Sequence, residues 1–142
     1  MSDEIDIPKT VVFDTEPLVA QAASETGEEV VESYLDRVKE GDLEGFVSPV
    51  TLTEVKYITQ RVETAISTDV FLSWIQTLLH RVDASDCWND AARYKEKHQV
   101  ALGDAYSLAT ANYVDGTLLA GADDDFDTID DVEVDRFRED PA

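Results

Sequence analysis

Short apolar runs alternate with segments of helical periodicity along most of this 142-residue chain. β-branched and aromatic residues form the run at 10–13, and further short apolar runs follow at 45–50 and 117–120. Between these runs, apolar residues recur every three or four positions, most regularly at 70–79. Strands that alternate with helices in this way are typical of an α/β domain with a mostly parallel sheet.

The apolar periodicity and the turn residues between the runs define one series of elements. Strands are expected at residues 10–13, 45–50, 81–84, 117–120 and 132–134. Helices are expected at residues 15–24, 28–39, 51–65, 68–80, 86–99 and 104–114. With 43% hydrophobic residues the chain can bury a core, and its length fits one domain. We therefore predict a single domain over 1–142, with its core at about 11–134 and an acidic end at 123–142.

The chain is strongly acidic, with 32 Asp and Glu residues against 11 Lys and Arg and a formal net charge of −21. Ten of the acids lie in 123–140, so most of the acidity is spread over the rest of the chain. Such a surface is typical of a protein from a high-salt cytoplasm, where salt screens repulsion and carboxylates maintain solubility. We expect an origin such as a haloarchaeon. The alternative is an acidic mimic of nucleic acid, which needs no catalytic residues.

Several classes of protein are excluded by what the sequence lacks. It has one cysteine, Cys87, so neither an intrachain disulfide framework nor a multi-thiolate zinc site can form. It has no phosphate-binding loop, no GxGxxG motif and no GxSxG motif. The acidic start at 1–6 predicts no signal peptide, and no apolar run approaches the ~18 residues that span a membrane. We expect a soluble, cytoplasmic protein with no membrane partner, in which any catalysis depends on carboxylates.

Four acids stand where an active site of an α/β domain would form. Asp14 and Asp123 each come just after an expected strand, while Glu54 and Asp104 lie in the first turn of expected helices. Because ligands bind beyond the carboxyl ends of the strands in open α/β sheets, we expect these side chains to converge. Each acid alone has another interpretation: Asp14 and Asp104 suit helix N-caps, Thr51 to Glu54 matches a capping box, and Asp123 begins a run typical of a solvated turn. The functional interpretation therefore depends on the four acids together.

The segments around these acids resemble the four motifs of the PIN-domain family, in the same order along the chain. They read VVFDTEPL at 11–18, SPVTLTEV at 48–55, LGDAYSLATA at 102–111 and TLLAGADDDF at 117–126. The length and the lack of extra domains are most similar to the VapC-type toxins of type II toxin–antitoxin pairs. The resemblance implies a three-layer α/β/α fold with a short, mostly parallel sheet of four to five strands.

Two places depart from the pattern of the family. Glu16 stands where the family often has a small polar residue, and Gly121 and Ala122 replace the Thr-Asn often seen before the last aspartate. The run of three aspartates leaves two assignments for the fourth acid: Asp123 is the first choice, and Asp125 is a secondary metal ligand.

Four converging carboxylates cannot all stay ionised without a counter-charge, and a hard divalent cation such as Mg²⁺ or Mn²⁺ supplies one. In this interpretation Asp14, Asp104 and Asp123 hold the metal. Glu54 completes the shell, through water or by orienting the nucleophile. One or two ions would activate a water and stabilise the leaving oxygen of a phosphodiester. The resemblance implies that the substrate is RNA.

Residues that could contact such a substrate are few. Arg93 and Lys95 lie on one expected helix with Tyr94 between them, and Thr15 is next to Asp14. These three are candidate substrate-binding residues. The alternatives are an ordinary solvated helix face for the two cations and an ordinary helix cap for Thr15.

The resemblance also implies partners. It predicts a Mg²⁺- or Mn²⁺-dependent endoribonuclease that acts as a toxin, binds a small antitoxin protein and forms a homodimer. The amphipathic segments 28–39 and 68–80 could form the dimer or antitoxin groove, although such apolar stripes also occur in an ordinary core. Two alternatives are a non-catalytic PIN-like module that binds protein or RNA, and a nuclease of RNA maturation or DNA processing.

Overall fold

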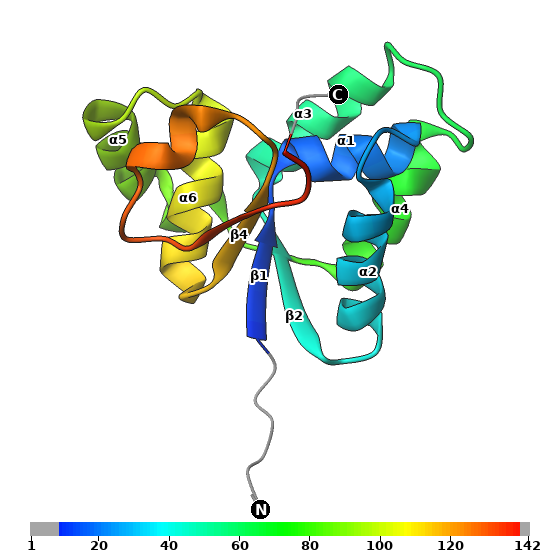
Figure 1. Ribbon diagram of the computed structural model, residues 1–142, viewed down its shortest axis with the longest axis horizontal. Coiled ribbons are helices and arrows are strands. Elements are labelled where there is room, and N and C mark those ends of the chain that lie inside the picture. The colour runs from blue at the N-terminus through cyan, green and yellow to red at the C-terminus, as the bar shows by residue number, and fades with distance from the viewer. Residues whose placement is uncertain (1–8, 140–142) are drawn as a thin grey trace, which may run out of the picture.

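The computed structural model describes residues 9–139, which form a central sheet flanked by helices (Figure 1). The strands are β1 (Lys9–Phe13), β2 (Leu43–Val47), β3 (His80–Arg81), β4 (Thr117–Ala120) and β5 (Val134–Arg136). The helices are α1 (Thr15–Ala23), α2 (Glu28–Lys39), α3 (Pro49–Thr59), α4 (Thr68–Leu78), η1 (Ala84–Asp86), α5 (Trp88–Lys97), α6 (Leu102–Val114) and η2 (Asp124–Thr128), of which η1 and η2 are short 3₁₀ helices. The acidic start at 1–6 and the last three residues of the acidic end lie outside the described residues. Within 9–139, no helix is long and apolar enough to cross a membrane.

All pairings between the strands are parallel, and their order across the sheet is β3-β2-β1-β4-β5. β1 is central, with Val12 opposite Phe46 of β2 and Leu118 of β4. β2 and β3 follow β1 in the chain and lie on one side of it, and β4 and β5 come later and lie on the other side. This confirms the predicted three-layer α/β/α fold, and it places the topological switch point between β1 and β4.

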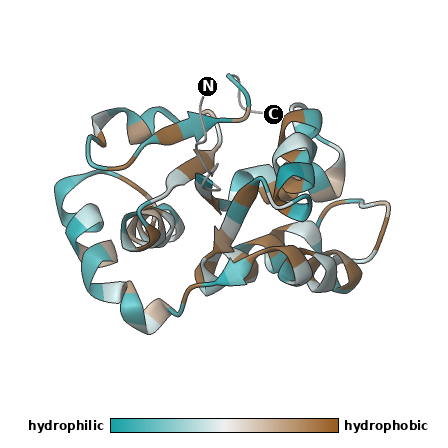
Figure 2. Ribbon diagram, turned by 90° about the horizontal axis from the view of Figure 1, so that it is seen from below, coloured by the Kyte–Doolittle hydropathy of each residue, from teal (hydrophilic) through white to brown (hydrophobic). Residues whose placement is uncertain are grey.

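Alternate residues of β1 pack against different helical layers. Val11 and Phe13 belong to the core beneath α1, α2, α3 and α4, whereas Val12 belongs to the core beneath α5 and α6. The two layers lie on opposite sides of the sheet in Figure 1, and Figure 2 shows hydrophobic stretches on the strands and on the helices beside them. Because these three side chains are at most 3% exposed, both faces of the central strand are buried, which explains its unbroken apolar run.

The second strand and the helix after it begin earlier than predicted. β2 ends at Val47 and α3 begins at Pro49, so the predicted bounds 45–50 and 51–65 are wrong. Ser48 is the N-cap, and its Oγ accepts a hydrogen bond from the backbone N–H of Val50 at 3.1 Å. Proline suits the first turn because its missing N–H would have no helical partner there. The outer strands are also displaced from their predicted bounds, because β3 and β5 stand where 81–84 and 132–134 were expected.

Candidate functional site

A pocket of about 680 Å³ lies where β1 and β4 end and where α1, α3 and α6 bring their N-terminal halves together. The residues that line it include Asp14, Glu54, Asp104 and Asp123, all four of the acids expected to converge. None of the described residues that line this pocket is basic. The pocket therefore gathers negative charge with no protein cation of its own.

Asp14 follows β1 directly and is buried, with 3% of its surface exposed. Its backbone N–H donates to the carbonyl oxygen of Leu119 at 2.9 Å, which extends the pairing of β1 with β4 by one residue. Asp14 occupies the N-cap position of α1, but its side chain makes no capping hydrogen bond. Instead, its Oδ1 accepts a hydrogen bond from the Ser107 hydroxyl at 2.8 Å. The capping interpretation therefore does not explain this carboxylate.

Two buried hydroxyl groups support Asp14 from behind. Ser107 of α6 and Thr51 of α3 are both fully buried, and their hydroxyl oxygens lie 3.2 Å apart. The chain Thr51–Ser107–Asp14 thus joins two helices to the end of the central strand. Ser107 is not among the residues singled out from the sequence. In the sequence, the one feature that distinguishes Ser107 is its polarity, among residues of the helix that are mostly small or apolar.

Glu54 lies in the second turn of α3, because the helix begins at Pro49 and is capped by Ser48. The alternative interpretation of Thr51 to Glu54 as a capping box therefore does not hold. The Oε1 atom of Glu54 accepts a hydrogen bond from the Thr15 hydroxyl at 2.8 Å. A Cβ atom at Gly103 would overlap the Glu54 carboxylate, so glycine at this position makes room for the acid.

Asp104 lies in the first turn of α6, whose N-cap is Ala101. Burial, followed by the negative charge of Asp14, raises the pKa of Asp104 to about 9. Burial also raises the pKa of Asp14. We call Asp14, Glu54 and Asp104 the inner acids, since all three line the pocket and none of them is exposed.

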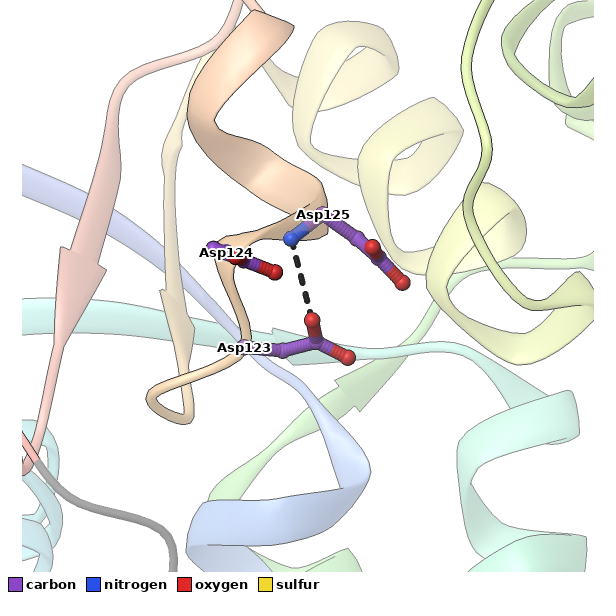
Figure 3. A group of neighbouring side chains, drawn as sticks. All are labelled: Asp123, Asp124 and Asp125. Atoms are coloured by element: carbon purple, nitrogen blue, oxygen red, sulfur yellow. Dashed lines mark hydrogen bonds between the residues drawn. The ribbon is translucent and has the colours of Figure 1, made fainter.

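The outer acids, Asp123, Asp124 and Asp125, lie together at the start of η2 (Figure 3). One carboxylate oxygen from each of the three lies within 4.8 Å of the others, the one such group of three among residues 9–139. Asp123 Oδ1 accepts a hydrogen bond from the backbone N–H of Asp125 at 3.0 Å, drawn as the dashed line in Figure 3. Asp123 and Asp124 line the pocket and Asp125 does not. For Asp123 the turn interpretation therefore holds as well, since its side chain caps η2.

The two cations expected to contact substrate lie elsewhere, on α5. Arg93 is held by Asp90, with Nε–Oδ1 at 2.7 Å, and by Asp131, with Nη2–Oδ2 at 3.1 Å. Lys95 Nζ donates to the carbonyl oxygen of Val100 at 2.8 Å. Neither residue lines the acidic pocket. Of the three expected substrate contacts, the structure brings only Thr15 to the pocket, where it holds Glu54.

The residues of the pocket fit a hard divalent cation. Carboxylate oxygens are the ligands that Mg²⁺ and Mn²⁺ prefer, and Asp14, Glu54, Asp104 and Asp123 present them from four separate elements. The raised pKa of Asp104 shows that the protein alone does not compensate this charge. A bound cation would supply the missing positive charge, so the donor set and the electrostatics agree.

Comparisons with known proteins agree with this geometry. The sequence model of the PIN domain matches residues 11–132. No curated protein matches the chain. Among solved structures, the fold is similar to VapBC2 from Rickettsia felis bound to a promoter DNA fragment, with a TM-score of 0.68 and 13% identity over 89% of this chain and 98% of that one. It is also similar to a toxin–antitoxin complex from Klebsiella pneumoniae, with a TM-score of 0.69 and 18% identity over 91% of this chain and 98% of that one.

A third similar fold is the DNA-bound VapBC from Salmonella typhimurium, with a TM-score of 0.63 and 15% identity over 93% of this chain and all of that one. At these identities the structural likeness supports the fold alone. The sequence match is the stronger result, because it covers most of the chain and includes each of the four acids at the pocket. The chain therefore belongs to the PIN domain family.

Proposed function

We propose that this chain is a divalent-metal-dependent ribonuclease and the toxin of a toxin–antitoxin pair. The observation that carries the proposal is the pocket in which the inner acids meet Asp123 with no basic residue in the described lining. A phosphodiester would be repelled from such a pocket unless a cation bound there first. Membership of the PIN domain family supports the same conclusion. We also propose that residues 11–134 are the core of a single domain.

In this proposal Asp14, Asp104 and Asp123 hold the cation, and Asp125 is a secondary ligand at the rim. A bound Mg²⁺ or Mn²⁺ supplies charge neutralisation and a water of lowered pKa for attack on phosphorus. Burial and the negative charge of Asp14 raise the pKa of Asp104 to about 9, and burial also raises the pKa of Asp14, so binding of a cation by this pair of carboxyl groups should release a proton.

Hydroxyl groups of the chain orient the acids for this role. Ser107 donates to Asp14 and restricts its carboxylate to one orientation. Thr15 donates to Glu54 Oε1, which leaves Oε2 to orient a water toward the substrate. Both contacts act on the acids directly, so their loss should weaken the site without removing a ligand.

An antitoxin partner is supported by the similar folds, which come from complexes described as VapBC or toxin–antitoxin. Large apolar side chains for a partner surface are present on and before α4: Ile66 is 47% exposed, Val70 57% and Trp74 39%. We propose that this face contributes to an antitoxin or homodimer interface. A neighbouring open reading frame for a small protein should exist, and co-expression should yield a complex that no longer cleaves RNA. A co-expressed protein that neither binds nor inhibits would contradict this part of the proposal.

The direct test uses purified protein in molar KCl with Mn²⁺. We expect cleavage of single-stranded RNA, loss of cleavage in EDTA, and recovery when Mn²⁺ is restored. Asp104→Asn should be inactive, whereas Asp36→Asn, an exposed acid on α2, should retain activity. Stabilisation by Mn²⁺ without cleavage would favour a binding module, and cleavage of DNA alone would favour a role in DNA processing.

We propose a high-salt origin from the distribution of the acids. Exposed acids such as Glu29, Glu32 and Asp36 lie along the outer face of α2. The chain has 32 Asp and Glu residues and only 11 Lys and Arg residues, so its basic residues are too few to pair with all of the acids. Salt screens their mutual repulsion. The melting temperature should therefore rise between millimolar and molar KCl, and an unchanged value would contradict the proposal.

A further inference from the structure

Arg138 is the only basic residue among 9–139 that is buried, with 8% of its surface exposed, and it lies beside the acidic pocket. Its Nη2 donates to Glu16 Oε1 at 2.8 Å. Its Nη1 donates to the carbonyl oxygen of Thr26 at 2.9 Å and lies 3.6 Å from Glu25 Oε1. Glu16 lines the wall of the pocket next to Asp14. The segment after β5 therefore brings a cation into contact with Glu16, a residue of the pocket lining.

Two glycines make room for this arrangement. A Cβ atom at Gly121 would overlap the Glu16 carboxylate. A Cβ atom at Gly27, where φ is +89°, would lie 2.8 Å from Cδ2 of Phe137. The backbone N–H of Phe137 donates to the carbonyl oxygen of Ala120 at 3.0 Å, which fastens the segment to the end of β4. Glu16 and Gly121, the two departures from the family pattern, thus fit one another.

The pairing changes the charge that the pocket presents. Glu16 without a partner would add one more carboxylate to a site that already holds Asp14, Asp104 and Asp123. Arg138 compensates that charge and holds the carboxylate against the pocket wall. Since the pair is partly buried, salt screens it less than it screens the exposed acids. Arg138 also lies beyond the residues matched by the family model, which end at 132.

We propose that Arg138 is a positioning residue of the acidic pocket, which holds Glu16 out of the cation's ligand shell. The inference rests on the proposed metal site and deepens it. The Arg138–Glu16 pair leaves the other acids of the pocket available to a cation, whereas Glu16 itself is already paired within the protein. The C-terminal segment is then part of the site through its charge, although it contributes no ligand.

The test is a Mn²⁺ titration followed by calorimetry, with the whole chain in molar KCl. Arg138→Met frees Glu16 to add a charged oxygen to the shell, and affinity rises with the number of charged ligands. We expect the half-saturating Mn²⁺ concentration to fall about fivefold or more. RNA cleavage should also fall, because the Glu16 carboxylate would occupy a position on the cation that the substrate needs. In the double variant Arg138→Met with Glu16→Gln, the Mn²⁺ affinity should return to within about twofold of the wild-type value.

The matched control is Arg37→Met, which removes the same charge from an exposed position on α2. Its Mn²⁺ affinity should equal that of the wild type. Equal affinities for Arg138→Met and Arg37→Met would overturn the inference. A shift in Arg138→Met that persists in the double variant would also overturn it, because the effect would not pass through Glu16.

A second route does not depend on the folding of Arg138→Met. Gly121→Ala should displace the Glu16 carboxylate from its place while Arg138 stays, and should raise Mn²⁺ affinity in the same way. Gly121→Ala with Glu16→Gln should show no such rise, because the displaced group is neutral. Unchanged affinity in Gly121→Ala would contradict the inference.

Failure of the inference and failure of the proposed function give different results. A wild-type protein that binds Mn²⁺ and does not cleave RNA contradicts the nuclease proposal alone, and the affinity shifts still test Arg138. An active wild type whose affinity does not change in Arg138→Met contradicts the inference alone. A wild type that binds no Mn²⁺ contradicts both.

Discussion

The inner and outer acids are the same kind of group held in two different ways. Asp14 and Glu54 each accept a hydrogen bond from a hydroxyl group that comes from another element, 93 and 39 residues away in sequence. Asp123 instead accepts one from a backbone N–H two residues further on. Asp14 and Glu54 are therefore positioned by contacts between elements far apart in sequence, and Asp123 by the local geometry of one turn. We infer that the inner acids set the activity and that the outer acids adjust it.

The largest effect should come from Asp14→Asn. This change keeps the size of the side chain and removes the charge of the most buried acid, so we expect RNA cleavage to fall by about 10³-fold or more, as when a central charge-stabilising group is lost. The melting temperature without metal should not fall, since the buried charge is unfavourable. Activity within tenfold of the wild type would mean that the inner acids are not the centre of the site.

A smaller loss is expected from Ser107→Ala. The hydroxyl group contacts Asp14 and not the proposed cation, and removal of such a supporting contact typically costs about 10–100-fold in metal affinity or activity. Mn²⁺ titration and RNA cleavage should both report it. Ser85→Ala, at an exposed position in η1, is the control and should behave as the wild type. Equal results for Ser107→Ala and Ser85→Ala would show that the contact from Ser107 does not position Asp14.

The outer acids should differ among themselves. Asp123 lines the pocket, and Asp125 does not, so Asp123→Asn should reduce cleavage by about tenfold or more and Asp125→Asn by less than about tenfold. The comparison is made at saturating Mn²⁺ and again at a limiting concentration. The opposite order would assign the fourth position to Asp125, the secondary candidate of the sequence.

The smallest effect is on stability without metal. The pKa of Asp104 is raised to about 9 in the folded protein, whereas a free aspartate titrates near ~3.9. Between these values the folded state holds a proton that the unfolded chain has lost, so stability falls as the pH rises through this range. The melting temperature in EDTA should fall between about pH 5 and pH 9.

Asp104→Asn should remove part of that fall and raise the melting temperature near pH 8 by roughly 3 °C or more, since about 1 kcal/mol shifts it by 2–4 °C in a domain of this size. Thermal denaturation followed by circular dichroism measures both. Mn²⁺ should also reduce the pH dependence in the wild type, because the cation replaces the proton. A wild type whose stability does not change with pH would show that the inner acids are compensated in another way.

Much of the fold follows from local pattern. The β-branched and aromatic run at 10–13 predicts a strand, which the structure shows as β1, and the helical spacing at 70–79 predicts α4. The error at β2 and α3 also has a local cause. Val50 looks like a continuation of the strand, although Ser48 and Pro49 carry the signals of a helix start. Positions after expected strands and in the first turns of expected helices selected four acids, Asp14, Glu54, Asp104 and Asp123, and all four line the pocket.

The supports of the site could not be predicted in the same way. Ser107 and Arg138 act on acids that are 93 and 122 residues away, and no spacing rule connects such positions. Gly103 and Gly121 matter because a distant carboxylate passes over them. The expectation for Arg93 and Lys95 followed from charge and proximity in sequence, which do not indicate the face of the domain on which a helix lies.

The position of β1 in the middle of the sheet has a consequence for synthesis. The ribosome makes this strand first, yet β4, its neighbour on the pocket side, follows about a hundred residues later, and Arg138 later still. Contacts so distant in sequence form late in folding. The acids of the pocket are spread from Asp14 to Asp124, so in a protein proposed to cut RNA the acidic pocket is incomplete on a nascent chain until β4 and the residues after it have been made.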